Sequence, residues 1–92
     1  MDATLNQKWT RSKSALSSEV DQETIILSIE ADEYVGFEGV GSRIWELLET
    51  PKALSEICDQ LMEEYEVKKE ACLTETQAFL ESLLAKKIVE KL

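Results

Sequence analysis

The sequence predicts a single small α+β domain, and three observations lead to this prediction. The chain has 92 residues, which allows one modest hydrophobic core. Its first half contains short segments rich in β-branched residues and separated by polar turns, whereas its second half contains longer segments with the apolar spacing of helices. Because the strands come first and the helices follow, the order does not provide the helical crossovers of a parallel sheet.

Three short strands are expected, joined by tight turns into an antiparallel meander. A weak first strand covers residues 14–20, and TIILSI at residues 24–29 is dense in β-branched side chains. The third strand is EYVGFE at residues 33–38. The connections at residues 21–22 and 30–32 are short and polar, which is typical of turns.

The segment before the meander shows no clear period. Residues 1–13 are largely polar, and Leu5 and Trp9 are their only large apolar side chains after Met1. We therefore expect an N-terminal arm at residues 1–13, either disordered or docked through Trp9. The domain itself is expected to cover residues 14–92.

Three amphipathic helices are expected after the strands. The first begins near Val40 and ends before Pro51, since the residue that precedes a proline avoids the α region. The second carries an unbroken apolar stripe at Leu54, Ile57, Cys58, Leu61, Met62 and Tyr65. The third covers residues 69–86, and residues 88–92 follow as an extended tail. Two helices joined by a short turn, with a third helix and a small sheet, form the winged helix-turn-helix arrangement.

The charge limits the kinds of partner that the protein can have. The chain has 19 acidic and 10 basic residues, with a net charge of −9, and this field would repel nucleic acid and anionic membranes. The sequence shows neither a secretory signal nor an apolar run of about 20 residues, so we expect a cytoplasmic protein without membrane contact. A neutral or basic peptide is a suitable partner.

Most residue types that support catalysis are missing. The chain has no histidine, which removes the usual general base at neutral pH. Cys58 and Cys72 are too few for a structural zinc site and lie within helical apolar patterns, so we expect buried free thiols. The three glycines, at positions 36, 39 and 41, match neither common phosphate-binding pattern. We therefore expect a binding protein with no enzymatic activity, no cofactor and no metal.

Several short motifs occur in an informative order. They are YVGFE at residues 34–38, IWELL at 44–48, LSEI at 54–57, YEV at 65–67 and TQAFLESL at 76–83. In this order and spacing the sequence resembles the PqqD-like family, the peptide-recognition elements of pathways that modify ribosomally made peptides. The resemblance covers residues 14–92. It implies a winged helix in which the leader of a precursor peptide lies as an extra antiparallel strand, in a groove between the third strand and the third helix.

Two departures from the family pattern refine this expectation. Phe37-Glu38 stands where the family usually has Leu-Asn, so the helix cap expected from asparagine is either lost or replaced. Residues 30–32 are EAD, whereas the pyrroloquinoline quinone chaperones usually carry Pro-Glu-Gly there. The chain more closely resembles the standalone leader-binding subunit of a split lasso-peptide maturation system, whose partner is a separate leader peptidase.

The resemblance implies that the leader-binding residues come from the third strand and the third helix. On the strand they are Glu33, Tyr34, Val35, Gly36, Phe37 and Glu38. On the helix they are Cys72, Glu75, Thr76, Phe79, Leu80 and Leu83. The spacing of Leu80 and Leu83 also fits ordinary core packing, and the sequence leaves open which face of the strand meets the leader. A strand at residues 33–38 without lysine or proline has an edge that can accept another strand.

Two functions remain as hypotheses. In the first, the protein binds the leader of a precursor peptide and delivers it to a leader peptidase or another modifying enzyme. The alternative is a winged-helix DNA-binding regulator, which shares the architecture. Its recognition helix would be the third, which has lysine pairs at residues 68–69 and 86–87 but acidic residues between them.

Overall fold

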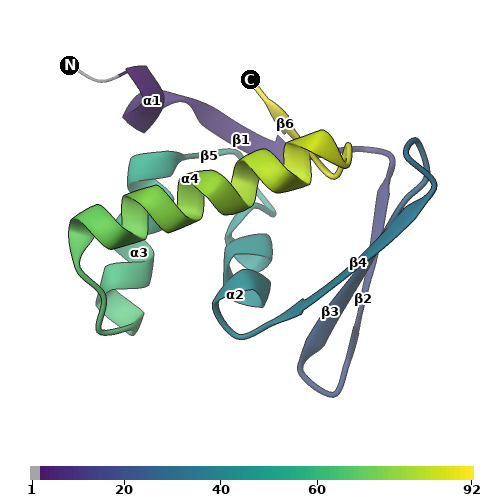
Figure 1. Cartoon of the computed structure of the whole chain (residues 1–92), viewed down its shortest axis with the longest axis horizontal. Coiled ribbons are helices and arrows are strands. Elements are labelled where there is room, and N and C mark those ends of the chain that lie inside the picture. The colour runs from purple at the N-terminus through teal and green to yellow at the C-terminus, as the bar shows by residue number, and fades with distance from the viewer. Residues whose placement is uncertain (1–2) are drawn as a thin grey trace.

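The computed structural model describes residues 3–92 of the chain (Figure 1). Its elements are α1 (Ala3–Asn6), β1 (Lys8–Arg11), β2 (Ala15–Val20), β3 (Glu23–Ser28), β4 (Glu33–Glu38), α2 (Val40–Leu47), β5 (Lys52–Ala53), α3 (Leu54–Glu64), α4 (Lys69–Ala85) and β6 (Val89–Lys91). The expected α+β class, with an antiparallel meander followed by three main helices, is confirmed. None of the helices in this range has the length and apolar character needed to cross a membrane.

The meander forms one sheet, which we call the wing and which comprises β2, β3 and β4. Its strand order is β2-β3-β4, with both pairs antiparallel. Asp21 and Gln22 both have positive φ, 49° and 71°, as a two-residue hairpin turn of the twisted type requires. Figure 1 shows the wing projecting at the right of the molecule, beyond the helices. The side chains of Thr24, Ile26 and Ser28 are buried on its inner face, because alternate residues of a strand share a face.

A second small sheet was not predicted. Its order is β5-β1-β6, and β1 pairs with both neighbours in antiparallel fashion. Residues 8–11, expected within an N-terminal arm, are thus its central strand, and Trp9 is completely buried there. The tail expected after the last helix supplies β6. The part of the arm at residues 1–2 lies outside the described residues.

The three main helices have the boundaries that the sequence predicts to within a few residues. α2 ends before Pro51, and α3 begins directly after the two-residue strand β5. The Glu56 side chain accepts a hydrogen bond of 2.7 Å from the backbone N–H of Ala53, which supports the start of α3. α2 starts from Gly39, at φ 62°, without a hydrogen bond from a capping side chain, as the loss of the asparagine cap implies.

The core lies where the helices, the second sheet and the inner face of the wing meet. Its fully buried members are Trp9, Ile26, Leu48, Leu54, Ile57, Cys58, Leu61, Leu80, Leu83, Ile88 and Val89. Burying these large side chains supplies most of the stabilisation of so short a chain. Cys58 and Cys72 are buried free thiols, so this expectation is confirmed.

Trp45 is a buried core residue, and Arg11 of the second sheet contacts it. The Arg11 guanidinium lies 4.4 Å from the centroid of the indole and donates hydrogen bonds of 2.6 and 3.1 Å to the Trp45 carbonyl oxygen. Burial lowers the pKa of Arg11, and the nearby carboxylates of Glu49 and Glu46 oppose this shift. Among residues 3–92, the buried indole N–H of Trp45 has no hydrogen-bond partner.

Candidate functional site

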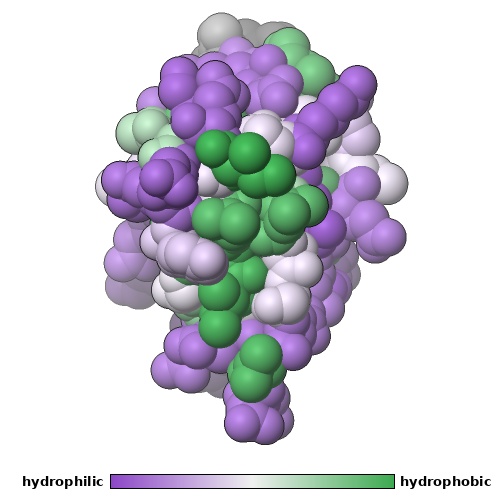
Figure 2. All heavy atoms as spheres, turned by 90° about the vertical axis from the view of Figure 1, so that its right-hand side faces the viewer, coloured by the Kyte–Doolittle hydropathy of each residue, from purple (hydrophilic) through white to green (hydrophobic). Residues whose placement is uncertain are grey.

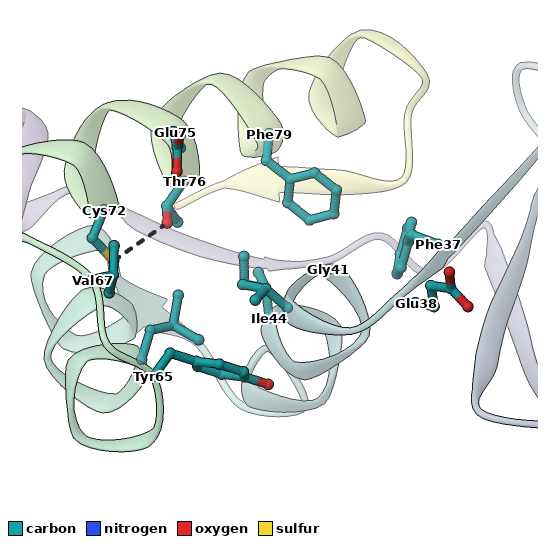
Figure 3. Close-up of a pocket in the computed structure, with 12 residues that line it drawn as sticks. Phe37, Glu38, Gly41, Ile44, Tyr65, Val67, Cys72, Glu75, Thr76 and Phe79 are labelled. Carbon is teal, nitrogen blue, oxygen red and sulfur yellow. Dashed lines mark hydrogen bonds between the residues drawn. The ribbon is translucent and has the colours of Figure 1, made fainter.

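A cleft of about 370 Å³ opens between the end of β4 and the three main helices (Figure 3). Its lining residues are Phe37, Glu38, Val40, Gly41, Ile44, Leu61, Tyr65, Val67, Cys72, Glu75, Thr76 and Phe79. Most of these side chains are apolar or uncharged, and Glu38 and Glu75 are exposed carboxylates. A cleft of this kind suits an apolar side chain of a ligand, with polar groups at its border.

The strand beside the cleft is an edge of its sheet. β4 pairs with β3 on one side, and within residues 3–92 no strand lies on its other side. The N-terminal segment, which could have covered this edge, belongs to the second sheet instead. Alternate residues of an antiparallel edge strand direct both N–H and C=O away from the sheet, so β4 offers backbone groups to a further strand.

The two faces of β4 differ in burial. Val35 and Phe37 are half-buried and pack against the core on the inner face. Tyr34 and Gly36 are exposed on the outer face. A strand added beside β4 would therefore meet the cleft with one set of alternate side chains, and would show the other set on the outer face of the wing.

α4 runs alongside β4, held at two points. The rings of Phe37 and Phe79 meet edge to face, with centroids 5.3 Å apart and planes at 77°. Beyond the end of α4, the Lys86 ammonium lies 3.4 Å from a carboxylate oxygen of Glu33, the first residue of β4; this exposed pair contributes little energy. Figure 3 shows the Phe79 side chain pointing from α4 toward Phe37. The groove that the resemblance implies, between the third strand and the third helix, thus has a structural counterpart.

A short chain of hydrogen bonds fixes the end of β4. The buried hydroxyl of Thr24 donates to the hydroxyl of Ser42 at 2.7 Å, and Ser42 donates to the carbonyl oxygen of Phe37 at 3.0 Å. Gly41 allows Phe37 to pack closely on α2, because a Cβ at position 41 would lie only 3.2 Å from the Phe37 Cβ. The position of Phe37 is therefore set from β3, from α2 and from α4.

The inner end of the cleft is formed by Cys72 and Thr76 of α4. Both are buried, and the Cys72 Sγ lies 3.9 Å from the Thr76 Oγ1. The second thiol, Cys58 of α3, is more deeply placed in the core. Burial, reinforced by hydrogen bonding to Cys72, raises the pKa of Cys58 to about 12. Cys58 is therefore protonated at neutral pH and is a poor nucleophile.

An ion pair holds the other wall of the cleft. Arg43 of α2 donates two hydrogen bonds of 2.8 Å and one of 3.1 Å to the Glu64 carboxylate at the end of α3. Hydrogen bonding to Arg43, and then to Gln60, lowers the pKa of Glu64, and hydrogen bonding to Glu64 raises the pKa of Arg43. The next residue, Tyr65, lines the cleft, so the pair fixes α2 relative to this aromatic wall.

The structure brings together part of the set expected from the sequence. Phe37, Glu38, Cys72, Glu75, Thr76 and Phe79 line one cleft. Glu33, Tyr34, Val35 and Gly36 extend from it along the edge strand. Leu80 and Leu83 do not line the cleft: they lie beyond Phe79 on α4 and are buried in the core. Their helical spacing already favoured core packing.

Half of the lining residues were not singled out from the sequence as binding residues. They are Val40, Gly41, Ile44, Leu61, Tyr65 and Val67. Most of them belong to apolar stripes that the sequence assigns to the core. A stripe shows which face of a helix is turned inward, but it does not show where neighbouring helices leave a gap. Tyr65, a tyrosine at the end of an otherwise aliphatic stripe, was the one available signal.

A winged helix with a free sheet edge beside an apolar cleft defines a class of binding domain, and comparisons with known proteins agree with it. Residues 23–89 match the family model described as coenzyme PQQ synthesis protein D. The chain belongs to the PqqD family, as the resemblance in the sequence indicated. No curated protein matches the chain significantly.

Two solved structures are similar to this one. The first, "TbiB1 in complex with the TbiA(beta) leader peptide", has a TM-score of 0.82 and 34% sequence identity, over 88% of this chain and 94% of that chain. The second, "Lasso peptide synthetase B1 complexed with the leader peptide", has a TM-score of 0.78 and 17% identity, over 89% of this chain and 96% of that chain. At that identity, the second similarity supports the fold alone.

Proposed function

We propose that the protein binds the leader segment of a ribosomally made precursor peptide as an additional strand on β4. The observation that carries this proposal is the unpaired edge of β4 beside the cleft. The solved relative with 34% identity, which is titled as a leader-peptide complex, supports the same ligand class.

Affinity and specificity have separate sources in this arrangement. Main-chain hydrogen bonds between the leader and β4 supply affinity for any extended peptide. One side chain of the leader enters the cleft between Phe37, Tyr65, Thr76 and Phe79 and selects for size and apolar character. Glu38 and Glu75 favour a leader with basic residues next to that anchor, each contributing about 0–1 kcal/mol because both are exposed.

The protein then presents the bound leader to a separate enzyme, a leader peptidase or another modifying enzyme, in lasso-peptide biosynthesis in the cytoplasm. We propose that it acts as an adaptor without catalysis of its own. The absence of histidine from the whole chain and the protonated state of Cys58 support this role. A leader held in extended form also presents its following core segment in a fixed direction.

The test is a titration of the ¹⁵N-labelled protein with a synthetic leader of the precursor peptide encoded beside this chain. We expect saturable shifts of amide signals at residues 33–38 and 72–79. A scrambled peptide of the same composition is the control and should leave these signals unchanged. Saturable binding that perturbs neither segment, or no binding at all, would rule the proposal out.

The same sample tests the DNA-binding alternative. The structure gives no specific observation in favour of it, and a net charge of −9 opposes it. A gel-shift assay with duplex DNA at low salt should show no retardation. Retardation that competes with leader binding would support the regulator instead.

A further inference from the structure

The outer face of the wing carries an unusual number of exposed apolar side chains. The exposed fractions of four of them are 56% for Leu16, 53% for Val20, 57% for Ile29 and 74% for Tyr34. Viewed from the right-hand side of Figure 1, this part of the molecule shows a strip of apolar side chains with hydrophilic ones around it (Figure 2). Folded monomers seldom leave such a strip uncovered unless it binds a partner.

The strand register makes this strip continuous. Leu16, Leu27 and Tyr34 lie opposite one another and form one row across all three strands. Side chains alternate along β3, and its buried residues point to the inner face. Ile25, two residues before Leu27, therefore lies on the outer face beside this row. Leu27 and Ile25 are only half-buried, so the centre of the strip is accessible as well as its ends.

The charge around this strip is of one sign. Residues 15–38 contain seven carboxylates and no lysine or arginine, so this segment accounts for −7 of the net charge of −9. The seven are Glu19, Asp21, Glu23, Glu30, Asp32, Glu33 and Glu38. The strand register puts Glu23 and Glu38 on the outer face, beside the strip, and Glu19 and Glu33 on the inner face. The other three lie in the turns that join the strands. Lys86, which directly follows α4, pairs with Glu33 from outside the wing. The face is thus an apolar centre bordered by carboxylates, a combination that selects partners by charge.

We infer that this face docks the enzyme that receives the leader, through an enzyme surface with an apolar centre bordered by lysine and arginine. The inference rests on the proposed function. A second copy of the chain fits less well, since its carboxylates would face those of the first copy. An anionic membrane is disfavoured for the same reason. The leader does not compete for this face, because it occupies the edge of β4 and the cleft on the inner side.

The test uses the purified leader peptidase of the pathway that contains this chain. Its affinity for the intact protein is measured by biolayer interferometry, with and without bound leader. The test variant is Leu16→Ser combined with Ile29→Ser, two exposed side chains whose loss should leave the fold intact. We expect affinity for the peptidase to fall about tenfold or more, as loss of central apolar contacts causes at interfaces. Leu92→Ser is the matched control, since Leu92 is apolar and exposed but lies outside the wing.

A second variant tests the charge. Glu23→Gln with Glu30→Gln should weaken the peptidase complex and reduce its dependence on salt concentration. Glu63→Gln with Glu66→Gln, which changes exposed carboxylates outside the wing, is its control and should change neither. Equal losses in the wing and control variants, or no loss in either wing variant, would overturn the inference.

Leader affinity, measured in parallel, separates the two proposals. If the wing variants bind the leader normally but lose the peptidase, both proposals stand. If the wild-type protein binds the leader and not the peptidase, the docking inference fails while leader binding stands. If the leader itself does not bind, the proposed function fails.

Discussion

The ring of Phe37, at the end of the edge strand β4, meets the ring of Phe79 on α4 edge to face, with 5.3 Å between their centroids. This contact ties the only wing strand beside the cleft to the longest helix. No residue of α4 beyond Phe79 lines the cleft, and Leu80 and Leu83 are buried in the core. The geometry of the leader site therefore depends on two half-buried aromatic side chains.

Replacing Phe79 with alanine should harm both stability and binding. The change removes the aromatic contact and part of the cleft wall, and we expect a loss of about 1–3 kcal/mol in the free energy of unfolding. Phe79→Ala should lower leader affinity more than Phe79→Leu does, because leucine keeps most of the apolar volume of the side chain. Urea denaturation and calorimetric titration measure the two effects. A variant with unchanged leader affinity would remove Phe79 from the site.

Gly41→Ala should act on the site more than on the fold. The new Cβ would lie 3.2 Å from the Cβ and 3.3 Å from two ring atoms of Phe37, so Phe37 must move. Alanine is also the better helix former by about 1 kcal/mol, which offsets part of the strain. We expect near-normal thermal stability with leader affinity reduced several-fold. Glu46→Ala on the exposed side of α2 should leave leader affinity unchanged.

The hydrogen bonds from Thr24 through Ser42 to Phe37 should be energetically coupled. Ser42→Ala leaves the buried Thr24 hydroxyl without this acceptor, and we expect a cost of about 1–2 kcal/mol. The same substitution should cost less in a Thr24→Val background, where no hydroxyl needs a partner. A double-mutant cycle by urea denaturation measures the difference. Equal costs in both backgrounds would show that the two hydroxyls act independently.

The raised pKa of Cys58 makes a contribution to stability that depends on pH. Its thiol titrates at about 12 in the folded protein, against 9.0 as its ordinary value. The unfolded chain loses this proton first, so the contribution is complete below about pH 9 and is lost as the pH rises toward 12. Wild type should therefore lose stability relative to Cys58→Val as the pH rises from about 9 toward 12. If the difference in the free energy of unfolding between the two proteins does not change with pH over this range, Cys58 is not a buried, protonated thiol.

Much of the fold follows from local sequence signals. The β-branched run at residues 24–29, the unbroken stripe of α3 and the stop before Pro51 each define an element without reference to the rest of the chain. The second sheet gives no such signal, because β5 has two residues and β6 has three. A strand that short exists only through its partners, so the place of Trp9 depended on tertiary contacts.

The residues of the candidate site also divide into those that the sequence indicates and those that only the tertiary structure reveals. Phe37, Thr76 and Phe79 could be proposed from the sequence because they belong to family motifs on two identifiable elements. Ile44 and Leu61 could not, since the spacing that assigns a residue to the inner face of a helix is the same for core and cleft. Only the packing of α2 and α3 against α4 separates the two environments.

The central claim is that the leader extends the wing sheet at β4, and amide hydrogen exchange of the protein with its leader bound tests it most directly. In the free protein, alternate β4 amides at the open edge should exchange rapidly. On leader binding, the exchange of those amides within residues 33–38 should slow markedly, while α1 and the β2 edge remain unchanged. Leader binding that leaves every β4 amide as exposed as before would contradict strand addition.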